Sequence, residues 1–255
     1  MNKSLLIAKY TFKQLLKSKI MLNCFWIGLA LMTFTYITSE FSFGNPKIVA
    51  MDFGVGVSSL AAVFIAIFLG ASLLSDEVES RTVYITLSRP VSRSSFIVGK
   101  IMGMSLILMI NILIIMGCSL VIYFLFGGEW SSLIFVYIIF GFLEALLLLL
   151  VVVFFSLITN KVISIMNTLV IFILGHAVPN SLDINMVENS EFLSILLKGY
   201  TYIMPDLDRF NLKKELAFGL PMDASTIINS SIYSVFYVSL LLMIIIFSFN
   251  RKELT

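Results

Sequence analysis

The chain has 255 residues, of which 59% are apolar and only 13% are Asp, Glu, Lys or Arg. Soluble domains carry about 25% charged residues, so a water-soluble fold of this composition would leave too much apolar surface exposed. The net charge of +2 says little about partners, and no nucleic-acid partner is expected. These values exclude an ordinary soluble domain and predict one integral membrane domain over residues 1–255.

The first segment, Asn2 to Lys19, is predicted to be an amphipathic helix that lies at the membrane surface. Its apolar residues form one stripe, and lysines four residues apart form another. Such a helix turns its lysines toward anionic lipid headgroups. The apolar stripe consists of Leu5, Phe12, Leu15 and Leu16, and the basic stripe consists of Lys9, Lys13 and Lys17.

Six apolar segments follow, each about long enough as a helix to cross a hydrocarbon core of about 30 Å. The expected spans are 20–38, 55–74, 100–126, 133–157, 162–178 and 227–249. The fifth is short and contains two polar residues, Asn167 and His176. The predicted fold class is therefore all-α, with six transmembrane helices.

The longest link, 179–226, contains a second amphipathic pattern that ends at Pro205. Leu193, Leu197 and Met204 share one helical face, and polar residues occupy the other. This apolar stretch is too short and too two-faced to span a bilayer. We expect an extracytoplasmic helix at the membrane surface.

The positions of lysine and arginine predict that both termini are cytoplasmic. With the N-terminus inside, all but five of the 17 Lys and Arg residues fall on the inner side, in keeping with the positive-inside rule. The five on the outer side are Lys47, Lys198, Arg209, Lys213 and Lys214. A multi-pass protein of the cytoplasmic (inner) membrane is expected.

The chain lacks the motifs of several enzyme classes. Its only Gly-Lys pair is Gly99-Lys100. Ser94 replaces the first glycine of the nucleotide-binding motif G-x-x-x-x-G-K-[ST], and Ile101 follows the lysine. There is no H-E-x-x-H or Cys/His cluster, and His176 is the single histidine, so no metal site is expected. We do not expect this chain to be an enzyme.

Glu144 stands alone in the middle of the fourth span. An ionisable group at that depth is costly and is a candidate functional residue. Two interpretations stay open. In the first, Glu144 has a structural role, either protonated or hydrogen-bonded to a polar residue of a facing helix such as Asn111 or Asn167. In the second, it takes part in substrate passage or subunit contact. His176 is expected at a different depth, as an interfacial or packing residue.

The most distinctive polar stretch, Ser75 to Gly99, joins the second and third spans on the predicted inner side. It begins SDEVESRTVYITLSRPVSR, and Gly99-Lys100 and Gly103 follow. We expect a structured element that couples to a partner, although charged inner loops are common and an ordinary solvated loop is the alternative. The candidate coupling residues are Asp76, Glu77, Glu79, Arg81, Arg89 and Arg93.

This stretch resembles the signature of ABC-2 type permeases, in which an acidic pair, then Arg-Thr, then Leu-x-x-Pro-Val-Ser-Arg and Gly-Lys recur at about this spacing. It is most similar to the branch associated with multicopper enzyme maturation, which includes the permease of the nitrous-oxide-reductase maturation transporter. The stretches MPDLDRFNL at 204–212 and RKEL at 251–254 agree. The resemblance implies a subunit that dimerises and carries two cytoplasmic ATPase subunits, which bind ATP and Mg²⁺, so this chain needs no cofactor of its own.

The leading hypothesis is the transmembrane subunit of an ATP-driven transporter or of a force-transmitting complex in the lipid membrane. In the force-transmitting complex, movement would be passed to an extracytoplasmic accessory protein. A secondary transporter or channel is the alternative, but it would need more polar groups at mid-membrane than Glu144, Asn111 and Asn167. A membrane-embedded enzyme is the third hypothesis, and it would need a buried catalytic pair.

Overall fold

The computed structural model describes residues 3–42, 44–79, 92–181, 195, 197, 199–201 and 204–251. The elements within these ranges are all helical. Six of the described helices are long and apolar enough to cross a membrane. The predicted all-α membrane fold with six spans is confirmed.

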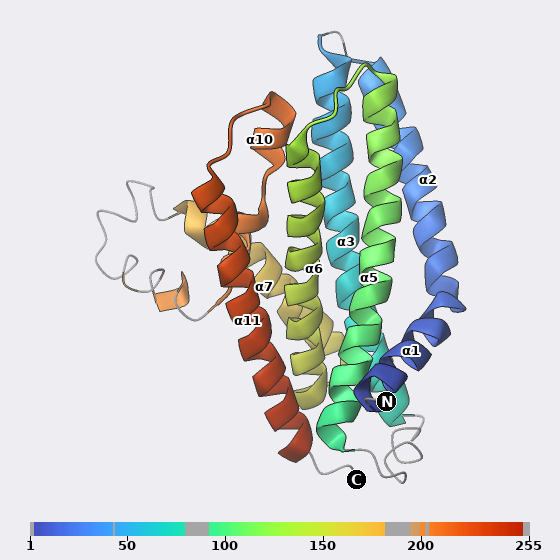
Figure 1. Cartoon of the computed structure of the whole chain (residues 1–255), viewed down its shortest axis with the longest axis vertical. Helices are drawn as coiled ribbons and strands as arrows, with labels where there is room; N and C mark the ends of the chain where they lie inside the picture. Colours follow the sequence, from blue (N-terminus) through green and yellow to red (C-terminus); the bar gives the residue numbers. More distant parts are fainter. Residues whose placement is uncertain are drawn as a thin grey trace.

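The six spanning helices run along the long axis of the molecule, with α7 oblique to the others (Figure 1). Both termini lie at one end, which we call the terminal end. The opposite end, with α10 and the connection from α5 to α6, is called the far end. The elements are α1 (Lys3–Leu16), α2 (Lys19–Glu40), α3 (Pro46–Glu79), α5 (Arg93–Leu125), α6 (Ser132–Ile158), α7 (Lys161–Ser181), η1 (Asp208–Phe210), α10 (Lys213–Phe218) and α11 (Ala224–Arg251).

The central helix is α6, which is apolar on nearly every side apart from Glu144 and Tyr137. Residues 147–153 are all buried, and none is more than 4% exposed. A helix that is hydrophobic all round belongs in a core. It contacts α3, α5, α7 and α11, whereas α2 and α11 turn large apolar side chains such as Trp26 and Phe236 outward. Lipid tails can accept such side chains without cost, because they are equally apolar.

Two spanning helices begin at least seven residues earlier than the sequence predicted. The helix α3 begins at Pro46 rather than at 55, because proline is well suited to the first turn of a helix. The helix α5 begins at Arg93 rather than at 100. Ser92 caps it, since the Ser92 hydroxyl oxygen accepts a hydrogen bond from the backbone N–H of Ser95 at 3.2 Å. The last part of the expected polar link is therefore helical.

The N-terminal helix α1 packs directly against α5. Two glycines on α5 allow the close approach. A Cβ atom added at Gly103 would lie 2.6 Å from the Cβ of Thr11 and 2.8 Å from the carbonyl oxygen of Ala8. One added at Gly99 would lie 2.7 Å from the carbonyl oxygen of Ser4. Only glycine fits at these two positions without displacing α1.

The buried face of α1 differs from the stripe that the sequence predicted. Leu15 is buried as expected, but Leu5 and Leu16 are 58% and 40% exposed. The reason is that the surface of α5 accepts small side chains at its glycines. The buried residues of α1 are Ala8, Thr11 and Leu15.

The link before α11 folds back onto the helix bundle. The surface helix expected over 193–204 lies mostly outside the described residues. From 205 onward the chain forms η1 and α10, which the sequence did not predict. Leu207, Phe210 and Leu212 are buried, and these two short helices contact α3, α6 and α7. Part of the predicted outer surface is thus part of the core.

A proline in α7 creates the attachment point for residues 205–218, which we call the returning segment. Pro179 has no N–H, so the carbonyl of Gly175 lacks its usual donor four residues later. The N–H of Leu207 donates to that carbonyl at 3.1 Å. The absent side chain of Gly175 leaves room, because a Cβ there would lie 2.9 Å from the Leu207 side chain. On the opposite side, the Tyr233 hydroxyl oxygen accepts a hydrogen bond from the backbone N–H of Asp206 at 2.7 Å.

The distribution of charge predicts that the terminal end faces the cytoplasm, which cysteine labelling can test. In a chain whose Cys24 and Cys118 are replaced, we expect an impermeant maleimide added to intact cells to label Glu129→Cys and not Lys9→Cys. Glu129 is at the far end and its side chain is 89% exposed, while Lys9 is an exposed residue of α1. Labelling of Lys9→Cys from outside would contradict the orientation.

Candidate functional site

The predicted coupling residues that the structure describes lie at the terminal end. Asp76, Glu77 and Glu79 fall in the last turn of α3, where the structure describes the backbone alone. Arg81 and Arg89 lie outside the described residues. The acidic residues therefore extend a spanning helix instead of beginning a loop.

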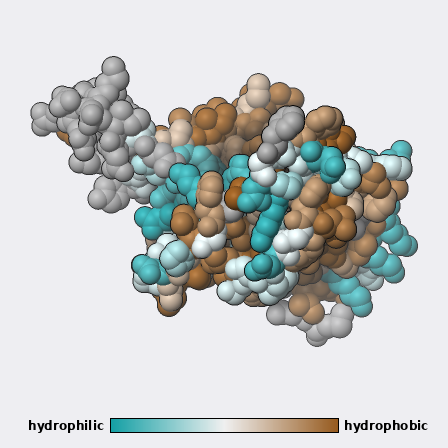
Figure 2. Space-filling view, turned by 90° about the horizontal axis from the view of Figure 1, so that it is seen from above, coloured by the Kyte–Doolittle hydropathy of each residue, from teal (hydrophilic) through white to brown (hydrophobic). Residues whose placement is uncertain are grey.

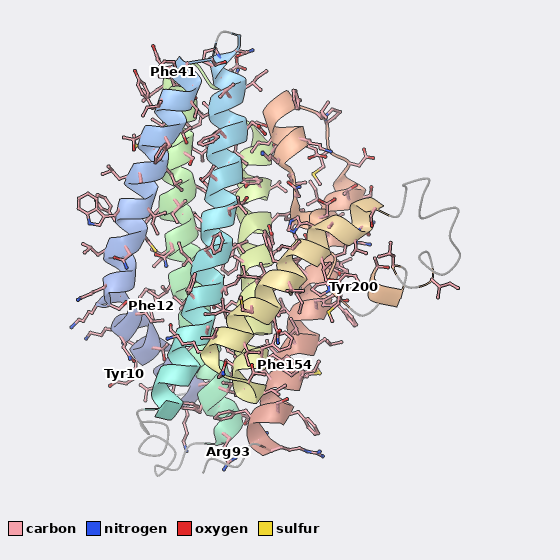
Figure 3. All side chains as sticks on the ribbon, turned by 180° about the vertical axis from the view of Figure 1, so that it is seen from behind. Tyr10, Phe12, Phe41, Arg93, Phe154 and Tyr200 are labelled. Atoms are coloured by element: carbon pink, nitrogen blue, oxygen red, sulfur yellow. The ribbon has the colours of Figure 1, made fainter. Side chains whose placement is uncertain are left out.

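Arg93, the remaining coupling candidate, connects two spanning helices. Its guanidinium Nη1 donates to the carbonyl of Asn250 in the last turn of α11 at 3.3 Å. Figure 3 shows Arg93 at the terminal end, beside the end of α11. A cation at a helix C-terminus complements both the free carbonyls and the helix dipole. Phe96 stacks on Phe249 at 5.9 Å between ring centroids, and Lys100 lies over the Phe96 ring. The start of α5 is thus joined to the end of α11.

A second site is a pocket of about 210 Å³ between α3, α6, α7 and residues 210–213. Each helix contributes residues spaced three or four apart, which lie on one helical face. Figure 2, which views the far end, shows hydrophilic residues near the middle of this end with hydrophobic ones around them. The polar side chains that line the pocket are Ser59, Tyr137, Glu144, His176, Asn211 and Lys213.

Glu144 contacts His176 in this pocket, rather than Asn111 or Asn167 as the sequence suggested. The Oε1 atom of Glu144 lies 3.4 Å from Nε2 of His176. The Nδ1 atom of His176 lies 3.1 Å from the carbonyl oxygen of Phe172, which orients the ring. Asn111 is fully buried, and neither polar atom of its side chain has a partner among the described residues. The prediction that Glu144 and His176 lie at different depths was wrong, because oblique α7 brings its later turns beside the middle of α6.

Lys213 reaches the pocket from α10 and pairs with a carboxylate on α3. Its Nζ atom lies 3.2 Å from Oδ1 of Asp52. Gly56, one turn after Asp52, leaves space for the lysine, since a Cβ there would lie 2.8 Å from Nζ. On the same segment, Arg209 pairs with Asp206 at 2.8 Å. Both cations are thus balanced by nearby carboxylates.

Sequence reasoning identified only Glu144 in this pocket as a functional candidate. A usable signal was present on α6, where Tyr137, Gly141 and Glu144 recur at the spacing of one helical face. Lys213 and Asn211 carried no comparable signal, because their place depends on how the returning segment packs.

Comparison with known proteins assigns the chain to a family. No curated protein sequence matches it closely enough to count as a relative. The family described as ABC-2 family transporter protein matches residues 5–254, nearly the whole chain. This match agrees with six spanning helices and with the role of an ABC transporter permease. The chain belongs to the ABC-2 transporter family.

Proposed function

We propose that the chain is a permease subunit that dimerises and is driven by a separate cytoplasmic ATPase, which binds ATP and Mg²⁺. Family membership supports the permease role, and the absence of the nucleotide-binding motif from the sequence supports a separate ATPase. Placement in the cytoplasmic membrane with both termini inside is part of the same proposal.

The observation that carries this proposal is the connection of three helices at the terminal end. There α1 is seated on Gly99 and Gly103 of α5, and Arg93 at the start of α5 holds the end of α11. A force applied to α1, or to the residues just before α5, would therefore reach two spanning helices. This arrangement suits a subunit that receives movement from a partner at its cytoplasmic end.

Two uses of that movement fit the same arrangement. One is export of a substrate across the membrane, and the other is transmission of force to an extracytoplasmic accessory protein. The motif in residues 75–103 favours the branch associated with multicopper enzyme maturation. We propose membership of that branch on this motif.

The test replaces Glu77, Glu79 and Arg81 separately by alanine and measures co-purification and hydrolysis by the co-expressed ATPase. We expect association to weaken at least about tenfold in one or more variants, because removing one member of a buried interfacial charge pair costs more than 1.4 kcal/mol. If Glu77 and Arg81 form an i, i+4 pair in one helix, that pair contributes only a few tenths of a kcal/mol, so helix loss would not explain the defect.

The matched control is Lys214→Ala, which removes an exposed charge at the far end. It should leave association and hydrolysis unchanged. If all three variants fold in membranes and behave like Lys214→Ala, Glu77, Glu79 and Arg81 do not contact the ATPase, and this part of the proposal is wrong.

A further inference from the structure

We propose that the pocket between α3, α6, α7 and residues 210–213 binds a small organic cation, with Glu144 as its counter-charge and aromatic rings as its walls. The binding site is a property of this chain alone. It stands apart from the ATPase partnership, and the two can fail independently.

Among the described residues that line the pocket, Glu144 is the carboxylate and Lys213 is the ammonium. The cation of Lys213 is balanced by Asp52, with 3.2 Å between them. Lys213 is therefore engaged outside the pocket, and no ammonium group among the described lining residues is left to pair with Glu144.

The site of Glu144 favours an exchange of partners. Its side chain is only 8% exposed, and what exposure it has is toward the pocket. A buried carboxylate requires a hydrogen-bonding or charged partner, which His176 supplies at 3.4 Å. Because an imidazole can be neutral, whereas a quaternary ammonium is charged at every pH, an incoming ammonium can replace His176 as the partner of Glu144.

Aromatic side chains surround the same space. Tyr137, Phe172 and Phe210 line the pocket, one from α6, one from α7 and one from the returning segment. Phe210 and Tyr137 are 1% and 5% exposed, so both rings are held firmly. The faces of aromatic rings attract cations, and cages of such rings recognise quaternary ammonium groups. A carboxylate with three rings matches an organic cation better than an anion.

The size of the pocket limits the ligand. A volume of about 210 Å³ would hold about seven water molecules at their volume in the liquid. A cation with about seven non-hydrogen atoms, such as choline, is of this size. Choline is therefore a suitable probe.

Equilibrium dialysis of radiolabelled choline against the purified chain in phosphatidylglycerol nanodiscs tests the proposal. We expect saturable binding of one choline per chain. Glu144→Gln should weaken it at least tenfold, and Phe172→Leu several-fold. His176→Gln should maintain or strengthen it, because the imidazole that competes for Glu144 is removed. The control Glu129→Gln, at an exposed carboxylate of the far end, should bind like wild type.

Several results would overturn the proposal. These are no saturable binding by the wild type, equal binding by folded Glu144→Gln, or saturable binding of acetate that Lys213→Gln abolishes. If Glu144→Gln does not fold, the other two variants test the proposal. Phe172→Leu should then bind choline more weakly than His176→Gln, and equal binding by these two variants would contradict the proposal.

The ammonium could come from solution or from a lipid headgroup. Phosphatidylglycerol carries no ammonium, so the first experiment measures free choline only. In phosphatidylcholine discs, a fall in choline binding would show that the lipid headgroup occupies the site, and unchanged binding would show that the site takes free cations. Both results support the proposed chemistry.

Discussion

Replacing Phe210 by alanine is expected to lower the free energy of unfolding by about 3–5 kcal/mol, the usual range for removing a buried phenylalanine. The Phe210 side chain is 1% exposed and meets the ring of Phe140 edge to face at 5.9 Å. Its loss would leave a cavity between α6 and the returning segment, along with the loss of that aromatic pair. Unfolding in mixed micelles, followed by far-ultraviolet circular dichroism, measures the change.

Phe218→Ala is the matched control, because it makes the same chemical change in the same part of the chain. Phe218 is 67% exposed at the end of α10, so its removal should change the free energy of unfolding by less than about 0.5 kcal/mol. Equal losses in the two variants would mean that the returning segment does not pack into the bundle.

Replacing both Gly99 and Gly103 by leucine is expected to detach α1 from α5. At each position the new Cβ would meet a backbone carbonyl of α1, at 2.7 and 2.8 Å, and a backbone atom cannot move aside as a flexible side chain can. Overpacking costs about 1–3 kcal/mol per site, so the pair should cost about 2–6 kcal/mol. Trypsin should then cleave α1 at Lys9 and Lys13 faster than in the wild type.

Gly117→Leu provides the control on the same helix. Nothing lies within 4 Å of a Cβ at Gly117, and leucine favours a helix more than glycine by several tenths of a kcal/mol or more. This variant should keep α1 protected from trypsin and be at least as stable as the wild type. If cleavage is unchanged in the double leucine variant, the glycines do not hold α1.

The spanning helices were predictable because a helix that crosses a membrane needs a long apolar segment, and such a segment can be recognised from consecutive residues of the sequence. The apolar run in α6 predicted a span, and its uniform apolar character is also typical of a buried helix, although we did not predict from the sequence that it forms the core. The contacts between helices were not predicted correctly. The pairing of Glu144 with His176 depends on the oblique course of α7, which neither residue's neighbours in sequence reveal.

The structure of the returning segment was not predicted, for a related reason. Its buried residues, Leu207, Phe210 and Leu212, do not follow a helical or strand period over any useful length. Pro179 can be recognised in the sequence as a residue that interrupts helical hydrogen bonding and so leaves the carbonyl of Gly175 without a donor. The sequence does not show which N–H donates to this carbonyl, because Leu207 lies far along the chain and reaches Gly175 only in the folded bundle.

The seat of α1 on α5 also sets an order of assembly during synthesis. The ribosome produces α1 before α5, and the glycines that receive it, Gly99 and Gly103, come after α2 and α3. At about 5–20 residues per second, α1 waits roughly 4–20 s before its partner exists. During that interval its lysines can hold it among the lipid headgroups. The N-terminal helix is thus made before α5 and docked late, and nascent chains stalled before α5 should leave it on the membrane surface.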